Sequence, residues 1–400
     1  MLKKQLGVIF GSRSCEHEVS IISALQLMKA ADSGKYDVVP IYIGMNGEWF
    51  SGAPLLDIKT YQSFDPYQKG IIRVWLDPVA GSGALLTLDP PKGMFKRERQ
   101  RLVARLDCII PVLHGMHGED GTLQGMLEMC NIPYASSGVA ASAVGMDKTY
   151  LKEFFKGCGF PVLPSCWALR SQWEANADAV ITEIESKLPY PVFVKPSSLG
   201  SSIGVSKAKN KDELKENLEL AFEFDRKVLI EQGLENPLEL NCSVLGYNDD
   251  VTASAIEMPV TGGDLLSFMD KYLQGGKSAG KGMASLKRIL PAPIEPELKD
   301  RIQALSVDIF KRMDCKGVVR IDFMFDAPTG GLYITEINTI PGSLAFYLWN
   351  ESGVKYPELI DRMVDYALKA HEEKNDSNYA FSSNILKEAS FGAKQGAKQQ

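Results

Sequence analysis

Strand and helix alternate along the first 130 residues, and this alternation restricts the possible folds more than any other feature of the sequence. The short apolar run Leu6–Phe10 is followed by a turn and then by helical spacing over Val19–Ala31. Two further apolar runs, Val38–Ile43 and Asp107–Leu113, have the length of buried strands. Strands separated by helices usually form a parallel sheet, because the helix carries the chain back to the same edge. We therefore predict an α/β domain with a parallel sheet at the N-terminus.

The pattern changes after Tyr190, where strand-like runs follow one another with few helices between them. Such a pattern is typical of an antiparallel α+β domain. Residues 261–288 then form a stretch rich in glycine, lysine and serine that shows little periodicity. A loop of this length inside a compact domain is usually functional, often a lid, or disordered, and we expect a lid. The strand-like runs cover residues 191–195, 204–207, 227–231 and 239–245.

The composition excludes several classes of protein. Of the 400 residues, 45% are hydrophobic and 24% are charged, which is typical of a globular enzyme with two or three domains. The formal net charge of −6 argues against general nucleic-acid binding. No apolar run reaches the ~18 residues that span a bilayer, and the first residues lack the apolar segment of a signal peptide. The seven cysteines are scattered, so we expect free thiols in the cytoplasm.

A strand lysine, Lys195, precedes a turn of small residues that ends at Gly204. The turn offers several backbone N–H groups, and the hydroxyls of Ser201 and Ser202, without bulky side chains, which suits a polyphosphate. It is not a Walker loop, because the lysine precedes the glycines and a strand follows. We interpret the segment as a flap folded over a nucleotide; the alternative is an ordinary hairpin turn.

A hairpin near the C-terminus carries a set of oxygen ligands. Glu336 and Asn338 share one face of its second strand, and Asp322 on the first strand is expected on the same face. Carboxylates that face one another are costly unless cations lie between them, and Mg²⁺ prefers oxygen ligands. Arg320 belongs to the same face and is expected to hold a phosphate or an oxyanion. The alternative is a solvent-exposed charged face, against which stand the apolar residues of a buried side: Ile321, Phe323, Ile334 and Ile337.

Three further positions are candidates for ligand binding. Glu231 and Glu239 flank the end of a strand, a place from which adenine and ribose are often recognised. His114 lies in a glycine-rich turn that opens a helix, so we expect it to line a ligand pocket; a metal site with His117 is the alternative. Glu16 opens the first helix, either as a site residue or as a partner of the helix dipole.

Together these segments resemble the D-alanine–D-alanine ligase family of the ATP-grasp superfamily, over roughly residues 5–370 and in order. The segments that carry the resemblance are residues 7–20, 114–125, 146–148, 195–204, 270–272, 320–322 and 336–342. The resemblance implies an α/β plus α+β architecture with an N-terminal pre-ATP-grasp (Rossmann-like) domain. The implied ranges are 1–113 for that domain, 114–190 for a central ATP-grasp subdomain, 191–371 for the C-terminal ATP-grasp domain, and 372–400 for a polar tail.

The resemblance also implies an activity. Two D-alanine molecules are joined to D-alanyl-D-alanine, a precursor of peptidoglycan, through a D-alanyl phosphate. ATP is the co-substrate, the expected metal is Mg²⁺ as two ions with Mn²⁺ as a substitute, and the expected assembly is a cytoplasmic homodimer without nucleic-acid or membrane partners. The alternatives are a related ligase that makes D-alanyl-D-serine or another D-alanyl product, and, more distantly, a nucleotide-binding regulator without catalysis.

The resemblance further assigns roles to individual residues. The implied catalytic residues are Glu16, Ser201, Tyr272, Arg320 and Gly342. The implied substrate-binding residues are His114, Lys271, Tyr347 and Leu348. The implied ATP-binding residues are Lys148, Lys195, Ser202, Glu231, Gln232, Leu234 and Glu239. The implied metal ligands are Asp322, Glu336 and Asn338, with Glu336 between two ions.

The sequence departs from the family pattern at three places. The turn before Glu239 is one residue longer than the common pattern, and the spacer between Asp270 and Lys271 is missing. Tyr347 stands where many members carry a small hydroxyl residue that holds the carboxylate of the second substrate. We therefore expect the Tyr347 phenol to donate to that carboxylate and the second site to favour D-alanine over D-serine.

Overall fold

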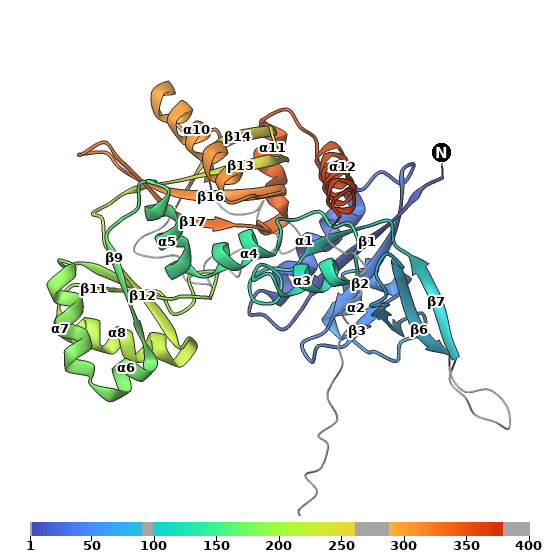
Figure 1. The fold of residues 1–400 in the computed structure, drawn as a ribbon, viewed down its shortest axis with the longest axis horizontal. Coiled ribbons are helices and arrows are strands. Elements are labelled where there is room, and N and C mark those ends of the chain that lie inside the picture. Colours follow the sequence, from blue (N-terminus) through green and yellow to red (C-terminus); the bar gives the residue numbers. More distant parts are fainter. Residues whose placement is uncertain (1, 90–98, 261–287, 379–400) are drawn as a thin grey trace, which may run out of the picture.

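The computed structural model describes residues 2–89, 99–260 and 288–378 of the chain. Figure 1 shows three parts, each built on a sheet, in the order N-terminal, middle and C-terminal along the chain. The segment expected to act as a lid lies outside the described residues, except for its last residue. Within the described ranges, no helix has the combination of length and apolarity that crossing a bilayer requires.

The N-terminal part contains the parallel sheet that the sequence predicts. β1 (Lys4–Gly11) pairs in parallel with β2 (Tyr36–Ile43) on one side and with β8 (Cys108–Val112) on the other. α1 (His17–Ala30) connects β1 to β2 and packs on one face of the sheet. Both faces are covered, so β1 is a continuous apolar run with little alternation. The other elements are β3 (Trp49–Ser51), η1 (Ala53–Leu56), α2 (Lys59–Gln62), β4 (Ile72–Arg73), β5 (Trp75–Leu76), β6 (Ala84–Asp89), β7 (Arg99–Arg105) and α3 (Thr122–Met129).

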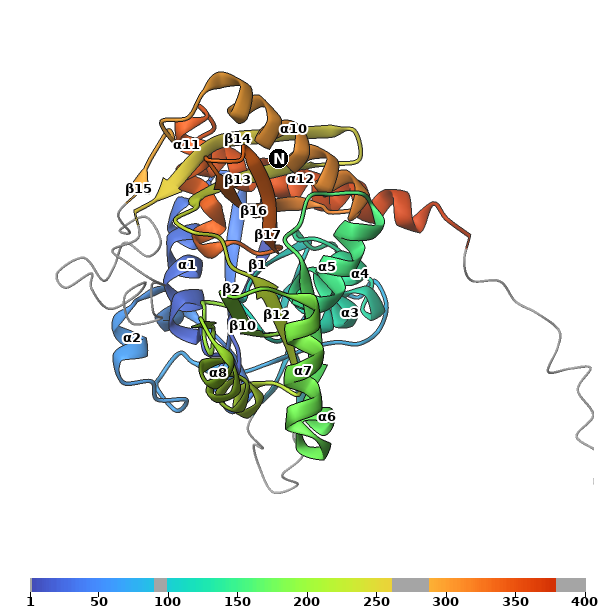
Figure 2. The same ribbon diagram turned by 90° about the vertical axis from the view of Figure 1, so that its left-hand side faces the viewer.

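The middle part is a four-stranded antiparallel sheet in the order β11-β10-β12-β9, with α7 and α8 packed on it (Figure 2). The expected domain boundary after residue 190 falls inside this sheet, because β9 (Ser165–Leu169) pairs with β12 (Lys227–Gln232). As expected, few helices separate the strands after residue 190: among the described residues from β10 to β13 the chain has the one helix α8 (Lys211–Phe224), whose buried Leu214 and Leu218 follow helical spacing. The remaining elements of this part are α6 (Arg170–Ala175), α7 (Ala177–Lys187), β10 (Val192–Pro196) and β11 (Ser206–Ala208), whereas α4 (Val139–Met146) and α5 (Lys148–Gly157) share the hydrophobic core of the C-terminal sheet.

The C-terminal part is a five-stranded sheet in the order β15-β14-β13-β16-β17, antiparallel throughout as predicted. Its last helix, α12 (Tyr356–Asn375), shares one hydrophobic core with β1 and α1, which joins the two ends of the chain. The polar tail expected from residue 372 therefore begins later, because the helix continues to Asn375. The other elements are β13 (Leu238–Tyr247), β14 (Asp250–Pro259), β15 (Arg288–Ile289), α10 (Pro296–Arg312), β16 (Gly317–Asp326), β17 (Gly331–Asn338), η3 (Gly342–Ala345) and α11 (Phe346–Glu351).

A left-handed turn leads the chain from β17 into α11. Ser343, Leu344 and Ala345 have φ angles of 51°, 53° and 50°. This conformation costs a residue with a Cβ atom about 1–2 kcal/mol. Packing maintains the turn: Leu344 lies in the core beside α1 and α12, and the Ser343 N–H donates to Ser23 Oγ at 3.0 Å.

Replacing Ser343 by glycine should stabilise the protein. Glycine adopts the left-handed conformation without steric cost, and the buried Ser343 Oγ has no hydrogen-bond partner among the described residues. These gains exceed the ~0.5–1 kcal/mol that glycine loses in chain entropy, so the free energy of unfolding should rise by about 1 kcal/mol. Urea denaturation measures it. The control is Ser306→Gly, which removes a buried serine bonded within helix α10 and should destabilise. A loss of stability in Ser343→Gly would contradict this account of the turn.

Candidate active site

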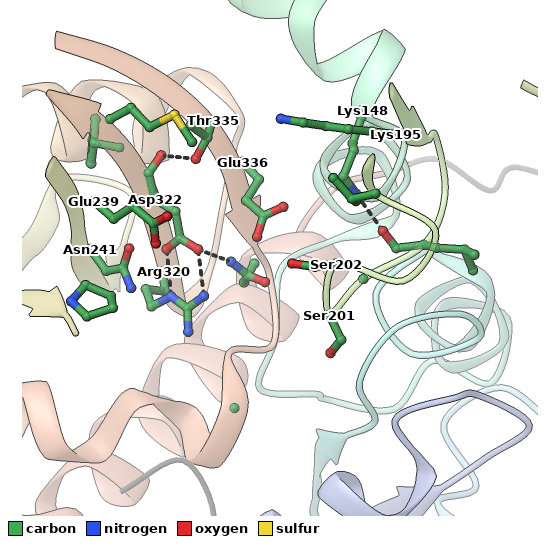
Figure 3. A pocket seen from close by; sticks show the side chains of 18 of the residues that line it. Lys148, Lys195, Ser201, Ser202, Glu239, Asn241, Arg320, Asp322, Thr335 and Glu336 are labelled. Atoms are coloured by element: carbon green, nitrogen blue, oxygen red, sulfur yellow. Dashed lines mark hydrogen bonds and ion pairs between the residues drawn. The ribbon is translucent and has the colours of Figure 1, made fainter. Parts of the chain in front are cut away.

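A cavity of about 610 Å³ collects most of the residues singled out in the sequence. The middle part, the C-terminal sheet and the first turn of α1 all contribute to its wall (Figure 3). The expected residues that line it are Glu16, His114, Lys148, Lys195, Ser201, Ser202, Leu234, Glu239, Arg320, Asp322, Glu336, Asn338 and Gly342. The expected residues that do not line it are Glu231, Gln232, Tyr347 and Leu348. Lys271 and Tyr272 lie outside the described residues.

The predicted set of oxygen ligands comes together on β16 and β17. Asp322 lies directly opposite Glu336, and Arg320 lies opposite Asn338. A bulge at this point shifts the register, because Phe323 pairs with Ile334 and leaves Thr335 as an extra residue. Simple alternation would turn Glu336 to the same side as the buried Ile334. The bulge allows Glu336 and Asn338 to share the cavity face with Asp322.

Arg320 and Asp322 form a bidentate ion pair beside Glu336. Arg320 Nε and Nη2 donate to the two Asp322 oxygens at 2.7 Å and 2.6 Å. Asn338 Nδ2 donates to Asp322 Oδ2 at 3.2 Å. Burial, with the charges of Glu336 and Glu257, raises the pKa of Asp322, while Arg320 opposes that rise. This pair uses only part of the acceptor capacity of Asp322.

The donor set at this face suits a hard divalent cation. It offers carboxylate oxygens from Asp322 and Glu336 and the amide oxygen of Asn338, and Figure 3 shows Glu336 pointing toward the loop of Ser202. Carboxylates that face one another are costly, and a cation held between Asp322 and Glu336 would offset their mutual repulsion. In the described part of the chain no cluster of three His, Cys, Asp or Glu residues has metal-binding geometry. The alternative metal pair of His114 and His117 gains no support: His114 bonds to other groups, and His117 lies near Asp120.

Glu16 joins the first helix to the serine loop. Its carboxylate accepts a short hydrogen bond from Ser201 Oγ, 185 positions away in the sequence. A Cβ atom at Gly115 or Gly200 would lie only 2.7 Å or 2.9 Å from Glu16 Oε2, so both glycines let backbone approach this carboxylate. Ser201 itself has a left-handed φ of 52°. The predicted link from Glu16 to Ser201 is thus present, and the link onward to Tyr272 stays a prediction.

Lys148 and Lys195 enter the cavity from the side opposite the carboxylates (Figure 3). Lys148 Nζ donates to the Leu199 carbonyl at 2.6 Å, which holds it at the serine loop. Burial lowers the pKa of Lys148, against the charge of Glu336, which raises it. Lys195 Nζ lies 2.6 Å from Glu231 Oε2. The two lysines therefore flank the turn in which the sequence predicts a phosphate site.

Glu231 has a role that the sequence did not reveal. Its carboxylate is 2% exposed and forms ion pairs with Lys195 and with Lys152. Lys152 is equally buried and also donates to the Ile334 carbonyl at 2.9 Å. Burial would raise the pKa of Glu231, but the charges of the two lysines outweigh it and hold the pKa at about 2. The carboxylate faces the two lysines, because buried charges require a counter-charge, and the expected role of Glu231 in adenine binding stays a prediction.

The nucleotide end of the cavity keeps part of the expected set. Leu234 and Glu239 line it, together with Asn236 and Pro237 of the lengthened turn. The Gln232 N–H donates to the Pro164 carbonyl at 2.9 Å, so this N–H serves the connection between strands. Adenine and ribose binding at Leu234 and Glu239 stays a prediction.

His114 and Glu119 hold the segment that leads to Gly342. His114 Nδ1 lies 2.9 Å from the Ile340 carbonyl and Nε2 lies 3.0 Å from Ser23 Oγ, which assigns the proton to Nδ1. Burial lowers the pKa of His114, so the ring is neutral. Glu119 accepts from the Ile340 N–H at 2.9 Å, and burial with the charge of Glu16 raises its pKa to about 8. Glu119 was not expected as a site residue, although it belongs to the segment 114–125 that carries the family resemblance.

Tyr347 lies behind the cavity wall, contrary to expectation. Its hydroxyl donates to Glu257 Oε1 at 3.0 Å, and its ring packs under the Arg288 guanidinium. Leu348 is fully buried in an apolar cluster with Ala345. The predicted hydrogen bond from the Tyr347 phenol to a substrate carboxylate is corrected, because the phenol already donates its hydrogen bond to the buried Glu257 carboxylate. Glu257 and Arg288 line the cavity, and neither belongs to a motif in the sequence.

Comparison with known proteins identifies relatives along nearly the whole chain. The family model described as the N-terminus of D-ala D-ala ligase matches residues 5–137, and the model of its C-terminus matches residues 154–365. A D-alanine--D-alanine ligase from Acetivibrio thermocellus is 40% identical over 93% of this chain and 97% of its own length. One from Natranaerobius thermophilus is 38% identical over 96% and 100%.

Solved structures agree with these relatives. The VanG D-Ala:D-Ser ligase from Enterococcus faecalis has a TM-score of 0.75 and 30% identity, and the match covers 92% of this chain and all of that one. The D-alanine-D-alanine ligase from Coxiella burnetii has a TM-score of 0.74 and 26% identity, with 94% and 96% covered.

The buried pair of Lys152 and Glu231 should be costly to break. Lys152→Met leaves a buried carboxylate with one partner, so the free energy of unfolding near pH 7 should fall by about 3–5 kcal/mol. The control is Lys187→Met, whose exposed pair with Glu183 contributes about 0.5 kcal/mol or less.

The same experiment has a pH signature. The Glu231 pKa is lower in the folded protein than in the unfolded chain, so its stabilisation is complete above its ordinary pKa of 4.5 and is lost as the pH falls toward 2. The deficit of Lys152→Met should shrink over that range in chemical denaturation. An equal, small deficit in both variants at pH 7 would show that the pair does not stabilise the fold.

Proposed function

Because the chain belongs to the D-alanine–D-alanine ligase family, it is an ATP-dependent ligase that joins two D-alanine molecules, and we propose which of its residues carry out that reaction. The observation that supports the assignment best is one cavity with lysines on one side and an arginine–carboxylate face on the other. An ATP-dependent ligation of a carboxylate to an amine needs cations that bind the phosphates of ATP. It also needs a separate group that stabilises the oxyanion formed at the acyl carbon. The product, D-alanyl-D-alanine, is a peptidoglycan precursor.

The first step activates a carboxylate. The carboxylate of the first D-alanine attacks the γ-phosphorus of ATP, ADP leaves, and D-alanyl phosphate forms. Lys148 and Lys195 are placed to neutralise charge on the phosphoryl oxygens, and the Ser201–Ser202 turn is placed to bind the phosphates. Glu16, fixed by Ser201, is positioned to accept from the ammonium group of the first D-alanine. His114 contributes by holding the segment before Gly342.

The second step forms the peptide bond. The amine of the second D-alanine attacks the acyl carbon and loses a proton as the new C–N bond forms. The C–O bond to phosphate then breaks, and inorganic phosphate leaves. Arg320 donates to Asp322 through Nε and Nη2, and its Nη1 makes no hydrogen bond within the described ranges. We assign to this Nη1 the stabilisation of the tetrahedral oxyanion. We assign the second oxyanion donor to the Gly342 N–H, as the family resemblance implies.

Asp322, Glu336 and Asn338 would hold Mg²⁺. When bound, the ions supply charge neutralisation for the phosphates and the leaving group. The bulged hairpin of β16 and β17 directs these oxygens toward the side of the cavity that carries Lys148 and Lys195. Arg320 orients the Asp322 carboxylate. Two ions, Mn²⁺ as a substitute, a lid over 261–288, a homodimer and a cytoplasmic location remain predictions.

Product analysis tests the proposed function. The protein is incubated with ATP, Mg²⁺ and equal concentrations of D-alanine, D-serine and D-lactate, and products are identified by mass. D-Alanyl-D-alanine should dominate. D-Alanyl-D-serine is the specific competing product, because one of the similar structures is a D-Ala:D-Ser ligase. If D-alanyl-D-serine were the main product, D-serine would be the second substrate. ATP hydrolysis without any D-alanyl product would overturn the ligase assignment.

Glu336→Gln should remove activity while leaving the fold intact. Losing an anionic metal ligand should lower turnover at limiting Mg²⁺ by at least about a hundredfold, because even partners one shell further out contribute 10- to 100-fold to metal affinity. Phosphate release at graded Mg²⁺ concentrations measures the effect, and circular dichroism checks the fold. Glu372→Gln, on the exposed face of α12, is the matched control. Near-normal turnover of folded Glu336→Gln at limiting Mg²⁺ would refute the metal assignment.

A further inference from the structure

Three side chains that the reaction above does not use form a cluster at the cavity wall. Arg288 on β15 donates through Nη1 to Glu257 Oε2 on β14 at 2.8 Å, and both side chains are almost fully buried. The Arg288 guanidinium lies over the ring of Tyr347 on α11, with 3.8 Å between its carbon and the ring centroid. Glu257 Oε1 accepts from the Tyr347 hydroxyl at 3.0 Å and from Asn241 Nδ2 at 3.1 Å.

This cluster fixes a guanidinium at one place in the wall. Glu257 uses both oxygens on groups of the protein, and one of these bonds holds Arg288. Stacking on Tyr347 fixes the plane of the guanidinium, and a guanidinium presents a planar fork of donors that matches a carboxylate. A charged side chain held on a carboxylate and a ring, with its residue lining a ligand cavity, is arranged for recognition of an anion.

The cation lies on the side of the cavity where the peptide bond forms. Arg288 lines the same cavity as Arg320 and Gly342. Leu290, two residues beyond Arg288, packs against the apolar cluster of Ala345 and Leu348, directly after the Gly342 turn. Asn241, which donates to Glu257, lies directly opposite Glu257 on β14 and directly opposite Asp322 on β16, so the Arg288–Glu257 pair and the Arg320–Asp322 pair lie on either side of one residue of β13. Lys148 and Lys195, in contrast, reach the cavity from α5 and β10.

We propose that Arg288 binds the carboxylate of the second D-amino acid. The inference rests on the proposed function, in which the amine of that molecule attacks the acyl carbon beside Arg320. In an α-amino acid the carboxylate is attached to the same carbon as the amine. A second fixed cation beside the oxyanion stabiliser therefore holds the acceptor with its amine directed at the acyl carbon. Tyr347 and Glu257 act as positioning residues for Arg288. In this proposal Arg288, and not the Tyr347 phenol, binds the carboxylate of the second substrate.

The test separates the two steps of the reaction. Hydroxylamine attacks D-alanyl phosphate at the acyl carbon, displaces phosphate and gives D-alanyl hydroxamate, so it reports the first step without a second amino acid. D-Alaninamide is an acceptor that keeps the amine and lacks the carboxylate. Wild type, Arg288→Gln and Arg288→Lys are compared with hydroxylamine, D-alaninamide and D-alanine. Arg73→Gln, at a highly exposed arginine of β4, is the matched control.

Arg288→Gln should raise the KM for D-alanine as acceptor about ten- to a hundredfold, the usual loss for a charge-assisted bond. Hydroxamate formation and the use of D-alaninamide should stay within about twofold of wild type, since neither needs the carboxylate contact. Arg288→Lys keeps the charge but lacks the planar fork of donors, so its KM for D-alanine should lie between those of wild type and Arg288→Gln. Arg73→Gln should match wild type in all three assays.

Tyr347→Phe tests the positioning role. It removes the bond to Glu257 and keeps the ring under Arg288, so the acceptor KM should rise less than in Arg288→Gln, with kcat for hydroxamate unchanged. This variant also covers the case in which Arg288→Gln fails to fold. An acceptor KM that is unchanged in folded Arg288→Gln, or a parallel loss of hydroxamate formation, would overturn the inference. If wild type forms neither dipeptide nor hydroxamate, the proposed function itself fails.

Discussion

The charge buried around one cavity is the constraint on which the rest of this structure depends. Among the described residues that line it are six carboxylates and five lysine or arginine side chains, and each charge taken out of water requires a partner. The protein meets this requirement with ion pairs: Arg320 with Asp322 within β16, and Arg288 with Glu257 and Lys195 with Glu231 between different strands. Removing one member of such a pair costs more than the pair contributes, so the site and the fold are coupled.

These pairs also explain why the cavity has two chemically different sides. Lysines and hydroxyls come from α5, β10 and the serine loop, and suit the phosphates of ATP. The face of β16 and β17 carries carboxylate oxygens and one arginine, and suits metal ions and an oxyanion. The hydrogen bond between Glu16 and Ser201 connects the N-terminal part to the serine loop. This contact between distant segments fixes the position of the serine loop at the cavity. A reaction that first transfers phosphate and then forms an amide needs this separation.

The segment after β17 carries conformational strain at the reaction centre. Three successive residues after Gly342 are left-handed, and the segment is held by His114, Glu119 and Ser23 from the N-terminal part. Strain of this kind persists only where surrounding contacts determine the conformation. It places Gly342 at the cavity and directs α11 so that Tyr347 supports Arg288.

The sequence by itself predicted the parallel sheet, the antiparallel strands that follow it and most of the named residues that line the cavity. The apolar runs of β1, β2 and β8 predict a parallel sheet because their periodicity is local, and the small residues after Lys195 and the acids of the last hairpin carry their chemistry in the residue types. The tertiary structure decided what depends on distant partners. The extra residue Thr335 turned Glu336 into the cavity, Lys152 and Lys195 hold the Glu231 carboxylate, and Glu257 accepts the hydrogen bond of the Tyr347 hydroxyl. Each of these outcomes follows from pairing between segments far apart in the chain, which no local pattern encodes.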